Sequence, residues 1–162
     1  MSDDALIIYE AEIKKIETLL NRMLKGAEAK CAFLVDKDGH LICRQGFTRT
    51  IDTTALAALL AGSFASTKEI ARLVGEEEFS VLFHQGKKDH IHMSLAGERS
   101  ILVVVFDDRT TIGMVRLYAK ETAAELTKIF QDVQAKAQTG EAAVTGEFAD
   151  AAGDRLDDIF QD

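Results

Sequence analysis

The chain has 162 residues, of which 47% are apolar and 28% charged, and its formal net charge is −8. This balance is typical of one folded domain with an appendage, and it excludes a disordered chain and a membrane-spanning one, because no apolar run approaches the roughly 20 residues that cross a bilayer. The negative charge argues against nucleic-acid binding, which needs a clustered basic face. The N-terminal segment is acidic and lacks a basic region before an apolar stretch, so we expect no signal peptide, no membrane contact and a cytoplasmic protein.

The N-terminal part predicts a helix followed by a hairpin. A helix over residues 8–26 is indicated by apolar residues that recur at three- and four-residue spacing, and Gly26 is placed to end it. Two short apolar runs then meet at Asp38 and Gly39, where glycine can adopt the positive φ that a tight turn needs. The apolar helix positions are Tyr9, Ile13, Ile16, Leu20, Met23 and Leu24.

The central part predicts a second helix and three strands. Asp52 can accept hydrogen bonds from the first-turn amides of a helix that runs to about Val74 and ends at Gly75. Three strands separated by short turns follow, and short turns require antiparallel pairing. The strand segments are EFSVLFHQ, HIHMSLAG and RSILVVVFD.

A third helix is predicted from residue 111 to about 135, which gives the order helix, two strands, helix, three strands, helix. Five antiparallel strands with helices on both faces form a three-layer sandwich of the α+β type. The predicted domain covers residues 5–137.

Residues 138–162 differ in composition from the body. They hold seven acids and one base, a net of 1 − 7 = −6, which leaves only −2 for the rest of the chain. Residues 139–153 are small and acidic, so we expect a flexible segment. Beyond it, Leu156, Ile159 and Phe160 have the spacing of a short amphipathic helix that would need a surface to fold against.

No segment carries a catalytic or phosphate-binding motif, so we expect no enzyme activity, no catalytic residue and no cofactor. His90 and His92 share a strand face, and with His84 they could form a metal site, but solvated histidines at a sheet edge are the simpler interpretation. Cys31 and Cys43 lie in predicted strands without metal-binding or CxxC spacing, and reduced core cysteines explain them most simply.

The second helix carries two kinds of residue. Leu56, Leu59, Leu60 and Ile70 supply the bulk expected of a face packed on the sheet, beside a stripe of small residues. Gly62 lies in mid-helix at a cost of about 1 kcal/mol relative to alanine, which indicates that another backbone comes close. That backbone belongs either to the same protomer or to a partner. The small residues are Ala57, Ala58, Ala61, Gly62, Ala65 and Ser66.

Six segments in this order closely resemble the roadblock family of dynein light chains, over roughly residues 5–135 and with the acidic-apolar terminus included. The likeness is greatest to bacterial members that regulate a small Ras-like polarity GTPase. The segments are FLVDKDGHLI, IDTTALAALLAGSFAS, LVGEEEF, FHQGKKD, LVVVFDDRTTIGMVRL and ELTKIF.

The resemblance implies a roadblock/profilin-like fold and a homodimer that joins two sheets through the second helix and third strand. It also implies acceleration of GTP hydrolysis by remodelling the switch regions of a small Ras-like GTPase without an inserted arginine, in cell polarity or motility, with concentration at a cell pole. A scaffold that tethers a GTPase without changing its hydrolysis is the alternative.

The resemblance also implies which residues form the surfaces. The platform for the GTPase would be Ala58, Gly62, Ala65 and Glu69, of which Glu69 departs from the small residue that the family often has. A second contact, able to influence nucleotide exchange, would be Leu156, Ile159 and Phe160. The dimer interface would be Ala57, Ala61, Phe64, Lys68 and Arg72.

Overall fold

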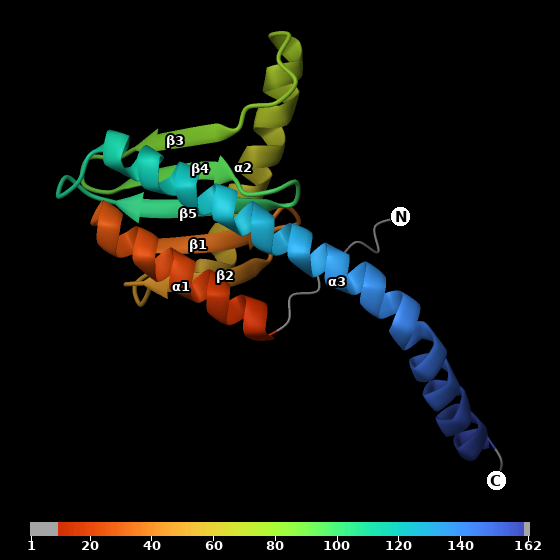
Figure 1. Ribbon diagram of the computed structural model, residues 1–162. Coiled ribbons are helices and arrows are strands. Elements are labelled where there is room, and N and C mark those ends of the chain that lie inside the picture. Colours follow the sequence, from red (N-terminus) through yellow and green to blue (C-terminus); the bar gives the residue numbers. More distant parts are fainter. Residues whose placement is uncertain (1–9, 161–162) are drawn as a thin grey trace.

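A computed structural model describes the backbone of residues 10–160 and the side-chain surroundings of residues 10–138 (Figure 1). The order of elements is the predicted one, and the predicted start of the first helix at residue 8 lies outside the described residues. The elements are α1 (Glu10–Ala27), β1 (Cys31–Asp36), β2 (Leu41–Gly46), α2 (Thr53–Leu73), β3 (Val81–Gln85), β4 (His90–Leu95), β5 (Ser100–Phe106) and α3 (Ile112–Phe160).

The five strands form one antiparallel sheet in the order β2-β1-β5-β4-β3. The hairpin and the three-stranded meander are joined by pairing of β1 with β5, in which Phe33 lies opposite Val103. This arrangement leaves β2 and β3 at the two edges. The predicted antiparallel sheet is confirmed.

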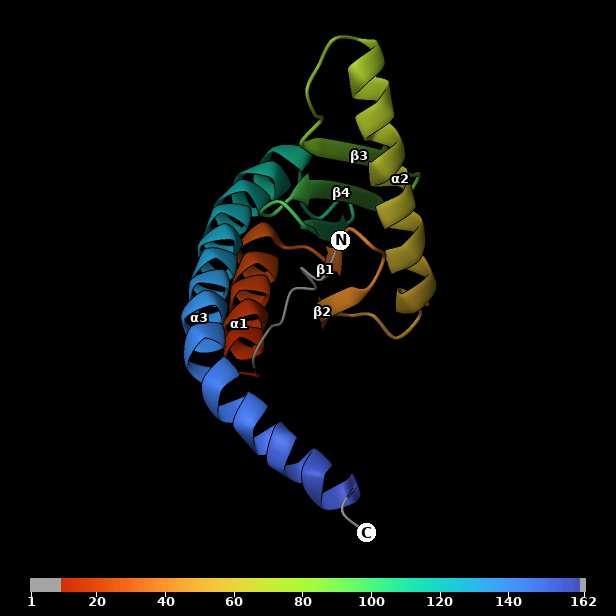
Figure 2. The ribbon, with the colours of Figure 1, turned by 90° about the vertical axis from the view of Figure 1, so that its right-hand side faces the viewer.

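Helices cover both faces of the sheet, with α1 and α3 on one side and α2 on the other (Figure 2). Side chains alternate between the faces along each strand. Leu34 and Val104 therefore pack under α1 and α3, while Phe33 and Val103 pack under α2, and all four are buried. The predicted three-layer sandwich is confirmed.

The turn, the helix cap and the helix end that the sequence predicted are also confirmed. Gly39 has φ 95° in the β1–β2 turn, and the Ala55 amide donates to the Asp52 carboxylate over 3.1 Å at the start of α2. Helix α2 ends at Leu73, and Gly75 follows with φ 83°. Each of these features depends on a few neighbouring residues, which explains why the sequence predicted them.

The predicted role of Gly26 is wrong. Helix α1 continues to Ala27, and Glu28 adopts the left-handed conformation with φ 54°. A β-carbon at position 26 would lie 2.7 Å from Tyr118 Cζ, closer than van der Waals contact allows. Gly26 therefore permits close packing of α3 on α1.

The predicted end of the third helix near residue 135 is also wrong, because α3 is one helix to Phe160 that extends beyond the sheet (Figures 1 and 2). Residues 139–153, expected to be flexible, contain five alanines, three glycines and no proline. Alanine has the highest helix propensity, and without proline no backbone donor is lost. A division between residues 5–137 and 138–162 stays a prediction.

Cys31 and Cys43 are free and buried on opposite faces of the sheet, one under α2 and the other under α1. Burial raises the pKa of each thiol to about 11. The prediction of reduced core cysteines is confirmed.

Candidate protein-binding surface

The inner face of α2 packs on the sheet through Ala57, Leu60, Ala61 and Phe64, which are 2–6% exposed and contact core residues of β1 and β5. The assignment of Ala57, Ala61 and Phe64 to a dimer interface is therefore corrected. These three side chains fill the protomer's own core and offer almost no surface to a second protomer.

Two of the residues expected on that inner face lie elsewhere. Leu59 is 69% exposed and Ile70 is 52% exposed, whereas Leu56 is partly buried as expected. Leu59 is rotated by about 100° about the α2 axis from the buried Leu60, so its side chain points away from the sheet. The C-terminal end of α2 extends past β3 (Figures 1 and 2). Amphipathic spacing alone did not distinguish these positions, because the helix is apolar on more than one side.

The outer face of α2 presents Ala58, Gly62, Ala65 and Glu69, all exposed. Their spacing of four, three and four residues aligns them in one stripe along the helix. A β-carbon at Gly62 would meet no atom within 4 Å. A close approach to Gly62 inside the protomer is therefore excluded, and the stripe is accessible from outside.

The stripe continues into an apolar end that the sequence reasoning missed. Leu73 lies four residues beyond Glu69 and is 79% exposed, and the neighbouring Val74 is 65% exposed. The signal was present as two large apolar residues directly before the helix-ending Gly75. Lys68 and Arg72 are also exposed, and the Arg72 guanidinium forms an ion pair with Glu69 at 3.0 Å.

Strand β3 adjoins this helix and forms a sheet edge. Val81 and Phe83 are 40% and 37% exposed, but they pair with Ser94 and His92 and so face the α3 side of the sheet, away from α2. An edge strand also presents backbone donors and acceptors that can pair with another strand. We call the outer stripe of α2, its apolar end and the edge of β3 together the α2–β3 surface.

A small pocket of about 140 Å³ opens beside this surface, between α2 and the segment that returns from it to β3. Ala65 and Lys68 line it from the helix, and Glu78 and Phe79 line it from the returning segment. Lys37 Nζ reaches Glu78 Oε1 at 4.0 Å across it. The pocket gives the otherwise flat helix face a recess next to Ala65.

The three histidines do not converge on a metal site. His90 and His92 are 6% and 2% exposed, so the interpretation of solvated edge residues is wrong for both. They face the α3 side of the sheet, whereas the exposed His84 pairs with Ile91 and faces the α2 side. Within the described residues no three histidine, cysteine, aspartate or glutamate side chains lie close enough to hold a metal ion.

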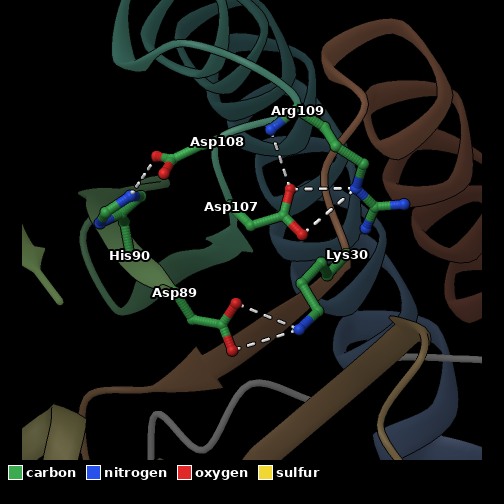
Figure 3. Close-up of polar contacts among 6 residues, drawn as sticks. All are labelled: Lys30, Asp89, His90, Asp107, Asp108 and Arg109. Atoms are coloured by element: carbon green, nitrogen blue, oxygen red, sulfur yellow. Dashed lines mark hydrogen bonds and ion pairs between the residues drawn. The ribbon is translucent and has the colours of Figure 1, made fainter. Parts of the chain in front are cut away.

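Polar contacts pin the β3–β4 turn to the neighbouring loops (Figure 3). The Gly86 amide donates to His90 Nδ1 at 3.2 Å, and His90 Nε2 lies 3.0 Å from Asp108 Oδ1. Lys30 Nζ forms an ion pair with Asp89 Oδ1 at 3.1 Å. These contacts explain His90 as a structural residue.

Arg109 is held in the same region. Its Nε donates to Asp107 Oδ1 at 3.0 Å, and this contact lowers the pKa of Asp107 and raises the pKa of Arg109 (Figure 3). The Arg109 guanidinium therefore binds a carboxylate of its own loop. In the sequence it is well separated from the stripe on α2.

The fold and the sequence together place the chain in a known family of domains. The model of the Roadblock/LC7 domain matches residues 15–106, and the chain belongs to that family. Myxococcus xanthus MglB is 49% identical, with a TM-score of 0.74, over 79% of this chain and 96% of that chain. The gliding protein MglB of Thermus thermophilus is 30% identical, with a TM-score of 0.74, over 79% of this chain and 97% of that chain.

More distant proteins are also similar to this chain. Acanthamoeba castellanii profilin II is 17% identical with a TM-score of 0.53, over 69% of this chain and 96% of that chain, so the roadblock/profilin-like architecture is shared. An uncharacterised protein of Methanocaldococcus jannaschii is 26% identical over 115 residues, which are 71% of this chain and 99% of that protein. Within the described residues, none of the helices is long and apolar enough to span a membrane.

Proposed function

We propose that this protein is an MglB-like regulator that binds a small Ras-like GTPase of the MglA type and accelerates its GTP hydrolysis. The observation that carries the proposal is the accessible small-residue stripe of α2 in a chain 49% identical to Myxococcus xanthus MglB. Small residues let a partner's backbone approach closely, and open space at Gly62 leaves room for that approach. Ala58, Gly62, Ala65 and Glu69 form the platform.

The protein acts on the GTPase as a homodimer. Lys68 and Arg72 flank the stripe, and Ile70 and Leu73 supply exposed apolar area next to the β3 edge. Pairing of two β3 edges would satisfy the backbone groups that an edge strand leaves open and would join two sheets into one. The α2 helices of two protomers then form one platform for one GTPase.

Acceleration does not use an inserted arginine. Arg72, next to the platform, is ion-paired to Glu69 at 3.0 Å, and Arg109 is bound to Asp107. Stabilisation of the charge that develops on phosphoryl transfer then comes from residues of the GTPase itself, positioned when the platform holds its switch regions. This function suits a protein of cell polarity or motility that gathers at a cell pole.

The far end of α3 makes a second contact with the GTPase and influences nucleotide exchange. Leu156, Ile159 and Phe160 have the spacing of one apolar helix face, although their side chains lie outside those described. An acidic, apolar-faced segment of this kind gains most from binding to a surface on another protein.

The test is GTP turnover by the cognate GTPase with and without the full chain. Ala65→Arg places a long charged side chain on the platform and should abolish acceleration. Ala124→Arg, the same change at an exposed alanine on α3, should leave it intact. Equal acceleration by both variants would show that the platform lies elsewhere. Binding without any acceleration by the unmodified protein would support the scaffold alternative.

A further inference from the structure

A second groove lies on the opposite face of the sheet, between α3 and the β3–β4 edge. It encloses about 700 Å³ and is lined by Val81, His92 and Ser94 from the sheet and by Arg116, Leu117 and Lys120 from α3. It faces away from α2, since Val81, His92 and Ser94 belong to the strand face that α1 and α3 cover. The proposed platform does not use it.

The floor of the groove contains polar atoms without partners. His92 is 2% exposed and neither ring nitrogen has a hydrogen-bond partner, and Ser94 is 7% exposed with an unpartnered hydroxyl. Burial, and next the nearby Arg116, lower the pKa of His92, so the ring is neutral at pH 7 with one donor and one acceptor nitrogen. Buried polar groups in folded proteins are nearly always paired, so these two indicate a ligand with polar atoms.

The charges at the rim of the groove favour a negatively charged ligand. Arg116 and Lys120 are the charged residues among those lining it, and both are positive in a chain of net charge −8. Leu117 beside them is 53% exposed, and Val81 opposite is 40% exposed. The groove is therefore complementary to an acidic segment that also carries apolar side chains.

The shape of the groove suits a linear segment. Its lining on α3 runs from Gly113 to Ala123, a separation of about ten residues that spans about 15 Å at 1.5 Å per residue. A helix of about ten residues has the same length. The last nine residues of the chain, DRLDDIFQD, are close to this length and carry both apolar and acidic side chains.

We propose that the groove binds the C-terminal segment, residues 154–162, of a second copy of this chain. Asp157 and Asp158 would lie against Arg116 and Lys120, and the apolar residues of the segment would lie against Val81 and Leu117. A second copy is needed because α3 is one helix from Ile112 to Phe160. The 43 residues from Leu117 to Phe160 carry the segment about 65 Å from its own groove.

This contact does not require the proposed GTPase regulation, but both use the same segment, so a bound GTPase would compete with a second copy for it. A tail-to-groove contact joins unlike surfaces and need not close into a ring. The full chain should therefore form larger assemblies as its concentration rises, and high salt should weaken them.

Charge exchange tests the contact by sedimentation velocity on full-length chains. Arg116→Glu with Lys120→Glu, or Asp157→Lys with Asp158→Lys, should lower the association constant roughly tenfold or more, because attractive pairs become repulsive. Mixing the groove-reversed chain with the tail-reversed chain should restore association. Lys87→Glu with Lys88→Glu, exposed in the β3–β4 turn, makes the same change in net charge away from the groove and should leave association unchanged.

A fluorescently labelled peptide of residues 150–162 measures binding of the C-terminal segment directly. Its fluorescence anisotropy should rise with the full chain carrying Leu156→Ser and Phe160→Ser, whose own tail is weakened, and a scrambled peptide should show no rise. The proposal is overturned if the charge-reversed chains associate as the unmodified protein does, if mixing restores nothing, or if the peptide fails to bind. Loss of GTPase acceleration has no bearing on these readings.

Discussion

Gly62 and Gly26 should respond in opposite ways to the same substitution. Gly62→Ala adds a methyl group where no atom lies within 4 Å, in the middle of a 21-residue helix. Alanine in a helix interior is more stable than glycine by about 1 kcal/mol. The protomer should gain about that amount, and its unfolding temperature should rise by about 3 °C for a chain of this size.

Gly26→Ala gains some of the same helix propensity but places its methyl carbon 2.7 Å from Tyr118 Cζ. The tyrosine ring must move or α1 must separate from α3, and such overpacking costs about 1–3 kcal/mol. We expect no gain or a net loss of stability. The pair separates the conformational effect of removing a glycine from the packing effect of adding a methyl group.

Urea and thermal unfolding should be measured at several protein concentrations, since assembly raises apparent stability. The concentration-independent part belongs to the protomer. A loss of stability in Gly62→Ala would refute the conclusion that its surroundings within the protomer are open. A gain in Gly26→Ala equal to that of Gly62→Ala would refute the close packing of α1 on α3.

Three further predictions follow from how far particular side chains are buried or exposed. Cys31 and Cys43 should not react with a thiol reagent at neutral pH until the protein unfolds, because burial raises each thiol pKa to about 11; prompt colour development in the native protein would contradict this. Burial lowers the pKa of His92 below its usual 6.5. As the pH falls from 6.5 toward that lowered pKa, the unfolded chain takes up the proton more readily than the folded chain, so stability should fall by up to about 1.4 kcal/mol per pH unit in this window. A His92→Gln chain should lose this part of the pH dependence in urea unfolding, and an unchanged slope would show that other groups cause it. Ile70→Asp with Leu73→Asp, at positions 52% and 79% exposed, should leave the protomer folded but weaken the proposed dimer, and an unaltered mass by light scattering would place the interface elsewhere.

The sequence predicted those features that short segments control. The turn at Gly39 and the cap at Asp52 each need one residue type in one local conformation, and both are present. Alternating apolar runs predicted the strands, and short turns predicted their antiparallel pairing. Helical spacing predicted a stripe of small residues on the second helix, but it did not separate Ala57 and Ala61, which are buried, from Ala58, Gly62 and Ala65, which are exposed.

Several predictions from the sequence were wrong because they concern burial, which depends on the segment that packs against each residue. His92 reads as a polar residue at an edge, yet α3 covers it. The apolar character of Leu59 and Ile70 predicted core positions, yet both side chains are exposed. Composition also misled beyond Gln138, where helix α3 continues through a segment expected to be flexible.

The two glycines show the division most clearly. By itself the sequence determined that Gly26 and Gly62 lie in or at the end of helices, since local spacing sets a helix. Only the tertiary structure decided that Gly26 faces Tyr118 while Gly62 faces open space. The reason is physical: helical periodicity is encoded over a few residues, whereas the neighbour of each face is set by packing between segments far apart in the chain.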